Sequence, residues 1–313
     1  MQTEKLAIGQ TRPVTAEEIE QYKTDGMVHL KGILDTDLVV RMEKVFMEVM
    51  DDESNGLASS DFGELARGLE AQGLEILNEG SSPSQASSST GNGKFKAGGF
   101  NCHNYPSLNE LGTRGPFGPI AAKLMGSERI CFYGDQLFWK QPNSLQRTAF
   151  HQDATYFHHE GEQCCTFWMP MEKVDEENGM MGYAKGSHRG ELYKPNLFVS
   201  QASFPGSEGK DLPDVEANEK EFNVVYCPAE PGDIIVHHVK TWHGSTGNTS
   251  QTRHRRAMTL RYLGDDVRYL ERMGTPPDSP KSAHLKDGDP IECEEFPLMW
   301  TRKDGFVAQT EAV

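Results

Sequence analysis

Three side chains that can bind one metal ion lie in two distant parts of this sequence. His151 and Asp153 are separated by a single residue, and His243 follows far downstream. Residues i and i+2 of an extended strand face the same side, so His151 and Asp153 can direct an imidazole and a carboxylate to one point. Residues 231–238, just before His243, predict a turn followed by a buried strand. A metal site therefore requires a fold that brings these two strand-like segments together.

Two histidines and one carboxylate on one side of a metal form the facial arrangement of non-haem Fe(II) oxygenases, which leaves positions open for a cosubstrate and O2. An isolated His-x-Asp is more often fortuitous. A second feature favours a metal site over a fortuitous match. Residues 255–262 form a strand-like run with Arg255 on the same face as residues 257, 259 and 261. A buried arginine can bind a carboxylate through two parallel hydrogen bonds.

Several short motifs, in this order, resemble the phytanoyl-CoA dioxygenase family. They are His151-Gln152-Asp153, Glu177-Asn178-Gly179, Lys185-Gly186-Ser187-His188, Pro231-Gly232-Asp233, His243-Gly244-Ser245 with Asn248, and Arg255-Arg256-Ala257. The resemblance extends from about Val14 to about Leu263. It implies dependence on Fe(II), 2-oxoglutarate and O2. It also implies a mainly β fold with flanking helices, the double-stranded β-helix (jelly-roll, cupin-like) barrel.

The resemblance also implies roles for particular residues. The metal ligands would be His151, Asp153 and His243, and the cosubstrate contacts would be Arg255 at the distal carboxylate of 2-oxoglutarate, Ser245 beside it, Gln136 and Trp168. Simple core packing explains Trp168 about equally well. Arg255 has neighbouring competitors, but Arg253 precedes the strand and Arg256 should face away. Arg261 shares the inner face, about 20 Å further along at roughly 3.3 Å per residue.

The paired histidines His158-His159 and His237-His238 are expected to be structural. Adjacent strand residues point to opposite faces, so neither pair can chelate one metal from a regular strand.

Composition restricts the class of protein. The 313 residues allow one large domain, and a net charge of −16 disfavours nucleic acid or an anionic membrane as a partner. There is no apolar run of about 18 residues, and the first residues lack a signal-peptide profile. The six cysteines include no Cys-x-x-Cys pair, which favours reduced thiols. We therefore expect a cytoplasmic enzyme acting on a small molecule, with a homodimer as one option for its oligomeric state.

The chain is expected to form a single oxygenase domain, residues 1–313, in four parts. Residues 1–50 form a helical flank, with a capping box at Thr15 and Glu18 and a second helix capped by Asp35. Residues 51–99 include a low-complexity stretch and predict a mobile insertion, either a plain linker or a lid over the active site. Residues 100–265 form the catalytic barrel, and residues 266–313 form a C-terminal extension.

Within the barrel, a helix is predicted around residues 118–125 and strands at 129–140, 164–171 and 180–184. Residues 189–222 have little periodicity and are long for a plain connection, which favours a binding loop.

The expected reaction is hydroxylation, or a related oxidation, of an aliphatic C–H in a small, largely apolar metabolite or natural product. Succinate and CO2 would be released. Asp153 favours this outcome, because related halogenases replace the carboxylate with a small residue. The alternatives are an acyl-CoA hydroxylase of the same family and, from another class, a non-oxidative metal enzyme or a non-catalytic ligand-binding barrel.

Overall fold

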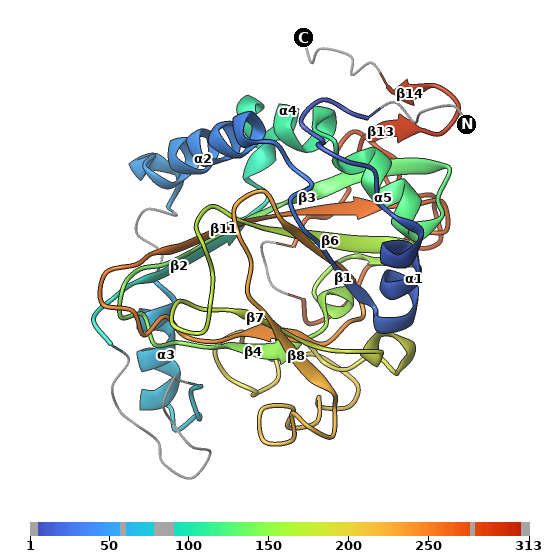
Figure 1. The fold of residues 1–313 in the computed structure, drawn as a ribbon. Helices are drawn as coiled ribbons and strands as arrows, with labels where there is room; N and C mark the ends of the chain where they lie inside the picture. The colour runs from blue at the N-terminus through green and yellow to red at the C-terminus, as the bar shows by residue number, and fades with distance from the viewer. Residues whose placement is uncertain (1–5, 57–60, 78–90, 276–278, 308–313) are drawn as a thin grey trace.

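Two antiparallel β-sheets lie face to face in the computed structural model, which describes residues 6–56, 61–77, 91–275 and 279–307 (Figure 1). The larger sheet has the strand order β1 (Met27–Leu30), β9 (Ile234–His238), β6 (Cys164–Pro170), β11 (Arg255–Leu263), β3 (Arg129–Lys140), β13 (Leu298–Thr301) and β14 (Gly305–Phe306), and β2 (Phe95–Gly99) also pairs with β3. The smaller sheet has the order β4 (Thr148–His151), β10 (His243–Ser245), β7 (Met181–Ala184) and β8 (Val224–Cys227). A separate pair joins β12 (Arg268–Tyr269) to β5 (His159–Glu160).

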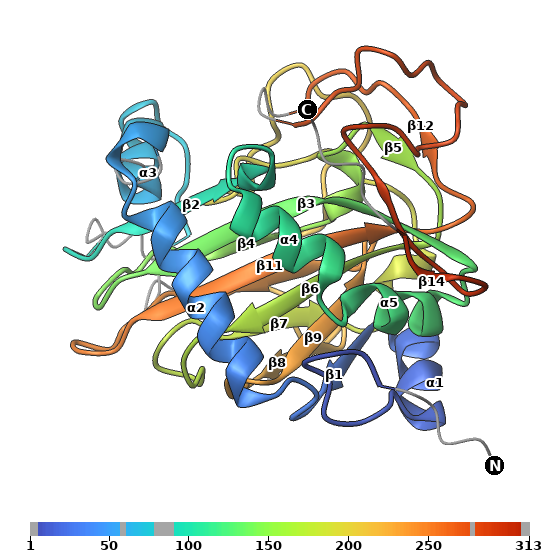
Figure 2. The ribbon, with the colours of Figure 1, turned by 90° about the horizontal axis from the view of Figure 1, so that it is seen from above.

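Helices cover the outer face of the larger sheet (Figure 2). They are α2 (Thr36–Met50), α4 (Pro106–Arg114) and α5 (Phe117–Met125), with α1 (Ala16–Asp25) beside β1. The predicted capping box of α1 is confirmed, because the Glu18 amide donates to the Thr15 hydroxyl and the Thr15 amide donates to the Glu18 carboxylate. Asp35 caps α2 as predicted, through a hydrogen bond from the amide of Leu38.

Strand β11 shows why the two faces of the larger sheet differ. Met258, Leu260 and Tyr262 point outward into the core beneath the helices. Arg255, Thr259 and Arg261, which alternate with them, line a cavity on the opposite face. The outer face is therefore apolar, whereas the inner face carries polar side chains into the space between the sheets.

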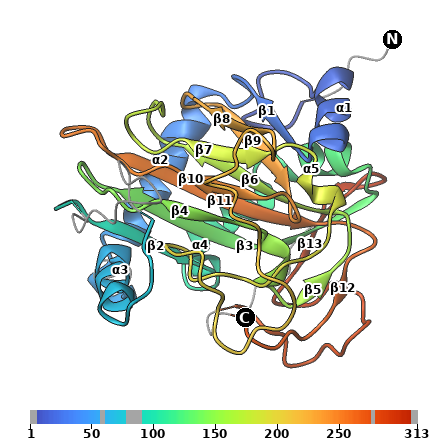
Figure 3. The same ribbon diagram turned by 90° about the horizontal axis from the view of Figure 1, so that it is seen from below.

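The pairing register of β11 with β3 and β6 places polar residues of the inner face side by side. Thr259 lies opposite Gln136 on β3 and opposite Trp168 on β6, and Arg261 lies opposite Thr166 on β6. The smaller sheet closes the space from below, where β4 and β10 are neighbours (Figure 3).

The segment 51–99 contains more structure than its sequence suggested. It includes α3 (Phe62–Ala71) as well as β2, whereas residues 78–90, with most of the low-complexity stretch, lie outside the described residues. Asp61 caps α3 by accepting from the Gly63 amide, and the Phe62 ring packs 5.3 Å from Phe95 and 5.2 Å from Phe198. Long-range aromatic packing and pairing with β3 thus order ranges that local composition left as a loop.

Residues after 265 also contribute to the larger sheet, since β13 pairs with β3. The six cysteines are all free thiols, as expected. None of the helices in the described ranges has the length and apolar character needed to cross a bilayer.

We predict that Leu260→Ala destabilises the protein strongly. Leu260 is fully buried between the larger sheet and the helices, so truncation leaves a cavity that costs about 2–5 kcal/mol of unfolding free energy. Denaturant unfolding measures this loss. Val40→Ala, on an exposed part of α2, is the matched control and should change stability by no more than about 0.5 kcal/mol. Equal effects of the two substitutions would contradict this packing.

Candidate active site

Strand pairing brings the two predicted histidine ligands together. His151 ends β4 and His243 begins β10, and the two residues are direct partners in the antiparallel ladder. Their rings lie 4.3 Å apart between centroids. Residues far apart in sequence therefore meet on the inner side of the smaller sheet.

Asp153 completes the set, although not from the strand that the sequence suggested. It begins the short 3-10 turn η3 (Asp153–Thr155), and only Gln152 before it keeps an extended conformation, with φ −113° and ψ 131°. One extended residue is enough to return the carboxylate to the same side as His151. The Gln152 amide group anchors this bend by donating to the backbone carbonyls of Glu191 and Lys240.

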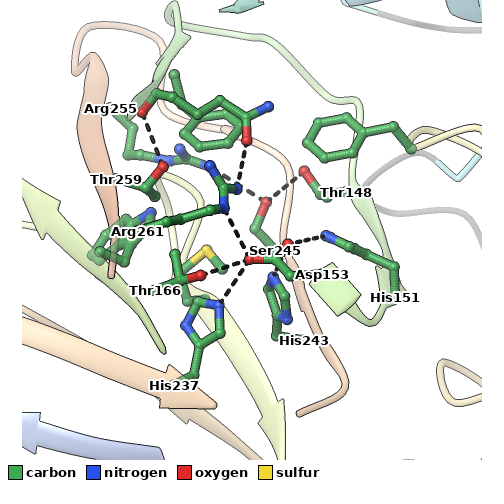
Figure 4. A pocket seen from close by; sticks show the side chains of 15 residues that line it. Thr148, His151, Asp153, Thr166, His237, His243, Ser245, Arg255, Thr259 and Arg261 are labelled. Carbon is green, nitrogen blue, oxygen red and sulfur yellow. Dashed lines mark hydrogen bonds and ion pairs between the residues drawn. The ribbon is translucent and has the colours of Figure 1, made fainter. Parts of the chain in front are cut away.

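The three ligand atoms fit one metal ion. Asp153 Oδ1 lies 3.7 Å from His151 Nε2 and 3.7 Å from His243 Nε2, and one ligand atom from each residue lies within 4.8 Å of the others (Figure 4). Two donors that are each roughly 2.1 Å from a shared ion can be at most about 4.2 Å apart, and both distances from Asp153 Oδ1 are within this limit. All three side chains are buried. Among the described residues, this is the one group of three or more His, Cys, Asp or Glu side chains whose ligand atoms lie this close together.

Hydrogen bonds to the backbone orient both imidazoles. His151 Nδ1 lies 2.8 Å from the carbonyl oxygen of Ala149, and His243 Nδ1 lies 2.9 Å from that of Thr241. A carbonyl oxygen can only accept, so each Nδ1 carries the proton and each Nε2 keeps its lone pair for a metal. Burial, reinforced by neighbouring imidazoles, lowers the pKa of both side chains to about 3, so both are neutral at pH 7.

Residues of the larger sheet hold the second oxygen of Asp153. Thr166 Oγ1 donates to Asp153 Oδ2 over 2.7 Å, and Arg261 Nε donates to the same oxygen over 3.3 Å. Burial acts to raise the pKa of this carboxyl, but Arg261 and the nearby histidines outweigh it and hold the pKa well below its ordinary value. Asp153 is therefore ionised, with Oδ1 directed toward the two Nε2 atoms.

Arg255 lies at the other end of the same cavity. Its side chain is 1% exposed, its Nη2 donates to Ser245 Oγ over 3.2 Å, and its Nε has no hydrogen-bond partner in the described part of the chain. The guanidinium lies 5.9 Å from the centroid of the Trp168 ring. Burial lowers the pKa of Arg255 to about 10, although Glu172 and Tyr183 act in the opposite direction. A buried cation in this condition fits an anionic ligand.

The neighbouring arginines face elsewhere. Arg253 pairs with Asp175 and Glu177 outside the strand, and Arg256 pairs with Glu172 and Glu43 on the outer side. The alternation expected for this strand thus places Arg255, and neither Arg253 nor Arg256, in the cavity.

The other predicted residues line this cavity as well. Ser245 Oγ accepts from both Arg255 and Lys140 Nζ, Trp168 packs beneath Arg255, and Gln136 Oε1 accepts from Arg261 Nη2 over 2.8 Å. The cavity connects the arginine end to the metal ligands. Its geometry brings together all seven residues that the sequence suggested.

Several polar residues of the site, besides Thr166, were not among the site residues that the sequence suggested. Lys140, fully buried, donates to Ser245 Oγ and to the carbonyl oxygens of Gln146 and Thr246. Arg261 holds Asp153, and His237 lines the cavity with its ring 4.1 Å from that of His243. Strand alternation was the available signal. It had already placed Arg261 with Arg255 on the inward face, and it also places Lys140 with Gln136.

The histidine pair at 237 and 238 divides as alternation requires. His237 faces the cavity, but it is not in the group that fits a metal. His238 faces the other side, where its Nε2 lies 2.7 Å from the carbonyl oxygen of Glu162.

A second cavity, of about 290 Å³, adjoins the metal ligands. His151, Asp153, Gln136, Phe198 and Arg261 line both cavities. Most of the remaining wall is aromatic or apolar and comes from α3, from the segment after η3 and from residues 196–204. The long segment 189–222 thus contributes to a cavity beside the candidate metal site.

Comparison with known proteins places the chain in a family. The family model described as phytanoyl-CoA dioxygenase matches residues 22–257. The chain belongs to this family. The resemblance found in the sequence is therefore confirmed over most of the chain.

Curated relatives share only part of their length with this chain. A probable alpha-ketoglutarate-dependent hypophosphite dioxygenase from Stutzerimonas stutzeri is 27% identical over 140 residues, which is 45% of this chain and 47% of that protein. The peroxisomal phytanoyl-CoA dioxygenase of Homo sapiens is 28% identical over 140 residues, which is 44% of this chain and 40% of that protein. The chain thus matches less than half the length of each of these relatives.

Solved structures confirm the predicted jelly-roll fold. The non-heme alpha-ketoglutarate-dependent carbocyclase SnoK from nogalamycin biosynthesis superposes with a TM-score of 0.63 at 22% identity, covering 92% of this chain and 98% of that one. EctD from S. alaskensis, solved with 2-oxoglutarate and 5-hydroxyectoine, superposes with a TM-score of 0.60 at 18% identity, covering 90% of this chain and 86% of that one.

We predict that His151→Ala abolishes stoichiometric Fe(II) binding without unfolding the protein. This substitution removes one ligand but leaves the contact between Asp153 and Arg261 intact, whereas Asp153→Ala would also leave a buried arginine unpaired. Anaerobic dialysis followed by metal analysis measures binding, and circular dichroism checks the fold. His254→Ala, at an exposed histidine beside Trp139, is the control and should bind iron normally. Normal iron binding by the His151 variant would contradict the ligand assignment.

Proposed function

We propose that this protein is an Fe(II)- and 2-oxoglutarate-dependent dioxygenase. It hydroxylates, or otherwise oxidises, an aliphatic C–H of a small, largely apolar molecule. One observation carries the proposal: the buried group of His151, Asp153 and His243 shares a cavity with a buried arginine that contacts no carboxylate of the described residues. A metal hydrolase needs the three metal ligands but not the buried arginine.

The cosubstrate would lie between these two ends. Arg255 and Ser245 would bind its distal carboxylate, and Lys140 would hold Ser245 in place through the hydrogen bond to Oγ. Trp168 would support the guanidinium from below. Gln136 would contribute through the hydrogen bond that fixes Arg261 near the keto-acid end.

The residues of the chain hold and shield the reacting groups. The two Nε2 atoms and Asp153 Oδ1 would hold the iron, while Thr166 and Arg261 keep the carboxylate from rotating. Burial of all three ligands limits access of water. A bound iron supplies activation of O2 coupled to decarboxylation of 2-oxoglutarate, with release of succinate and CO2.

An acyl-CoA substrate is the second candidate, favoured by relatives named phytanoyl-CoA dioxygenase. The phosphates of CoA call for a cluster of cationic side chains. Lys94 precedes β2 and Lys96 lies within it, where the ammonium of Lys96 lies over the Trp139 ring. Two lysines provide little for such a ligand, so we favour the small apolar substrate.

Replacing Arg255 with lysine should weaken 2-oxoglutarate binding by about 1–3 kcal/mol, because lysine keeps the charge but loses the two-pronged hydrogen bond. Arg256→Lys is the matched control, since Arg256 faces the outer side and pairs with Glu172. Anaerobic titration of the Fe(II)-loaded proteins measures both affinities. If the Arg256 variant is the impaired one, the assignment of the inward residues of β11 is wrong.

The reaction class is tested by loading the protein anaerobically with Fe(II) and 2-oxoglutarate, admitting O2 and scoring a panel of small molecules for succinate. We expect succinate to form in proportion to the loss of 2-oxoglutarate. Turnover of any compound without loss of 2-oxoglutarate would favour a non-oxidative metal enzyme. Absence of 2-oxoglutarate binding would favour a ligand-binding barrel.

A further inference from the structure

Arg261 is a second buried cation, and it stands where the two cavities meet. It is 3% exposed, and its guanidinium lies 4.7 Å from the centroid of the Phe157 ring. Nε donates to Asp153 and Nη2 donates to Gln136, whereas Nη1 has no hydrogen-bond partner among the described residues. The stacked, doubly anchored guanidinium therefore presents one donor group in a fixed direction.

The positive charge of Arg261 would be incompletely neutralised once a divalent ion and 2-oxoglutarate are bound. Asp153 is the one carboxylate among the described residues that line the two cavities, and a bound divalent ion would share its charge. The two negative charges of 2-oxoglutarate would be matched by that ion and by Arg255. A buried guanidinium that shares its one carboxylate partner with a metal ion is incompletely neutralised, so a further negative group would be bound favourably.

The position of Arg261 connects it with the second cavity. Arg255, Ser245, Trp168 and His237 line only the first cavity, whereas Arg261 lines both. Arg255 is thus the cation of the cosubstrate end, and Arg261 is the cation that faces the second cavity. The rest of the second cavity is lined largely by aromatic and apolar side chains, namely Phe62, Leu65, Phe100, Tyr156, Phe157, Leu197, Phe198 and Phe204.

We propose that the substrate is an amphipathic carboxylic acid whose carboxylate is bound by Arg261 and whose apolar body fills the second cavity. The inference rests on the proposed dioxygenase function and adds the substrate class. Arg261 Nε lies 3.3 Å from an oxygen of a metal ligand, so the oxidised carbon lies within a few bonds of the carboxylate. A free acid, and not its thioester, satisfies the charge.

Matched acids and amides test this on the unaltered protein. Protein loaded anaerobically with Fe(II) and 2-oxoglutarate is titrated with straight-chain and phenyl-substituted alkanoic acids and with their primary amides, and binding is followed by calorimetry. Each pair differs in charge but hardly in shape. We expect the best acid to bind at least about tenfold more tightly than its amide, as a charged hydrogen bond warrants. Acids that bind no better than amides, or that do not bind, overturn the inference.

Arg261→Lys and Arg261→Met locate the effect. Lysine should retain part of the preference for acids and methionine should abolish it. The readout is the ratio of acid affinity to amide affinity at saturating Fe(II) and 2-oxoglutarate, because Arg261 also holds the metal ligand Asp153. If instead Arg261→Lys weakens 2-oxoglutarate as much as Arg255→Lys does, Arg261 serves the keto-acid end of the cosubstrate and the inference fails.

The same measurements distinguish failure of the dioxygenase proposal from failure of the substrate proposal. Unaltered protein that binds neither Fe(II) nor 2-oxoglutarate refutes the dioxygenase itself. Normal binding of both, without a preference for acids, refutes only the substrate class.

Discussion

The carboxylate of Asp153 links the two sheets, and the arrangement of the site depends on it. Asp153 lies two residues after the end of β4 in the smaller sheet. Thr166 and Arg261, which hold its second oxygen, belong to the larger sheet. A shift of one residue in β6 or β11 would turn these partners to the outer, apolar face. The hydrophobic pattern that packs Met258 and Leu260 under the helices therefore also sets the position of a metal ligand.

This arrangement buries three cationic side chains, and their burial costs folding free energy. Lys140, Arg255 and Arg261 are almost wholly buried on the inner face of the larger sheet, and of these only Arg261 contacts Asp153. Such groups cost stability unless they are hydrogen-bonded. Carbonyl, hydroxyl and amide oxygens satisfy them only in part, and Arg255 Nε and Arg261 Nη1 have no partner among the described residues. We infer that these buried cations serve anionic ligands and that this function is maintained at some expense of stability.

Local rules sufficed for a large part of the fold. The capping box at Thr15, the helix capped by Asp35 and the alternation in β11 follow from nearest-neighbour chemistry, and the structure has all three. The turn at Asp153 and the order of α3 depend on contacts with distant residues, which spacing alone cannot give. Arg261 was seen only as a remote competitor of Arg255, because strand rise measures the distance between the two arginines and not the reach of a long side chain toward Asp153.

The central claim is that one metal ion and one diacid bind in this cavity with a defined geometry. The most direct measurement is a crystal structure of the protein grown anaerobically with Fe(II) and 2-oxoglutarate. The account predicts iron on Nε2 of His151, Nε2 of His243 and Oδ1 of Asp153, with the distal carboxylate of 2-oxoglutarate on Arg255 and Ser245. Iron bound through Nδ1, iron bound to His237 in place of one of these ligands, or a distal carboxylate away from Arg255 would contradict it.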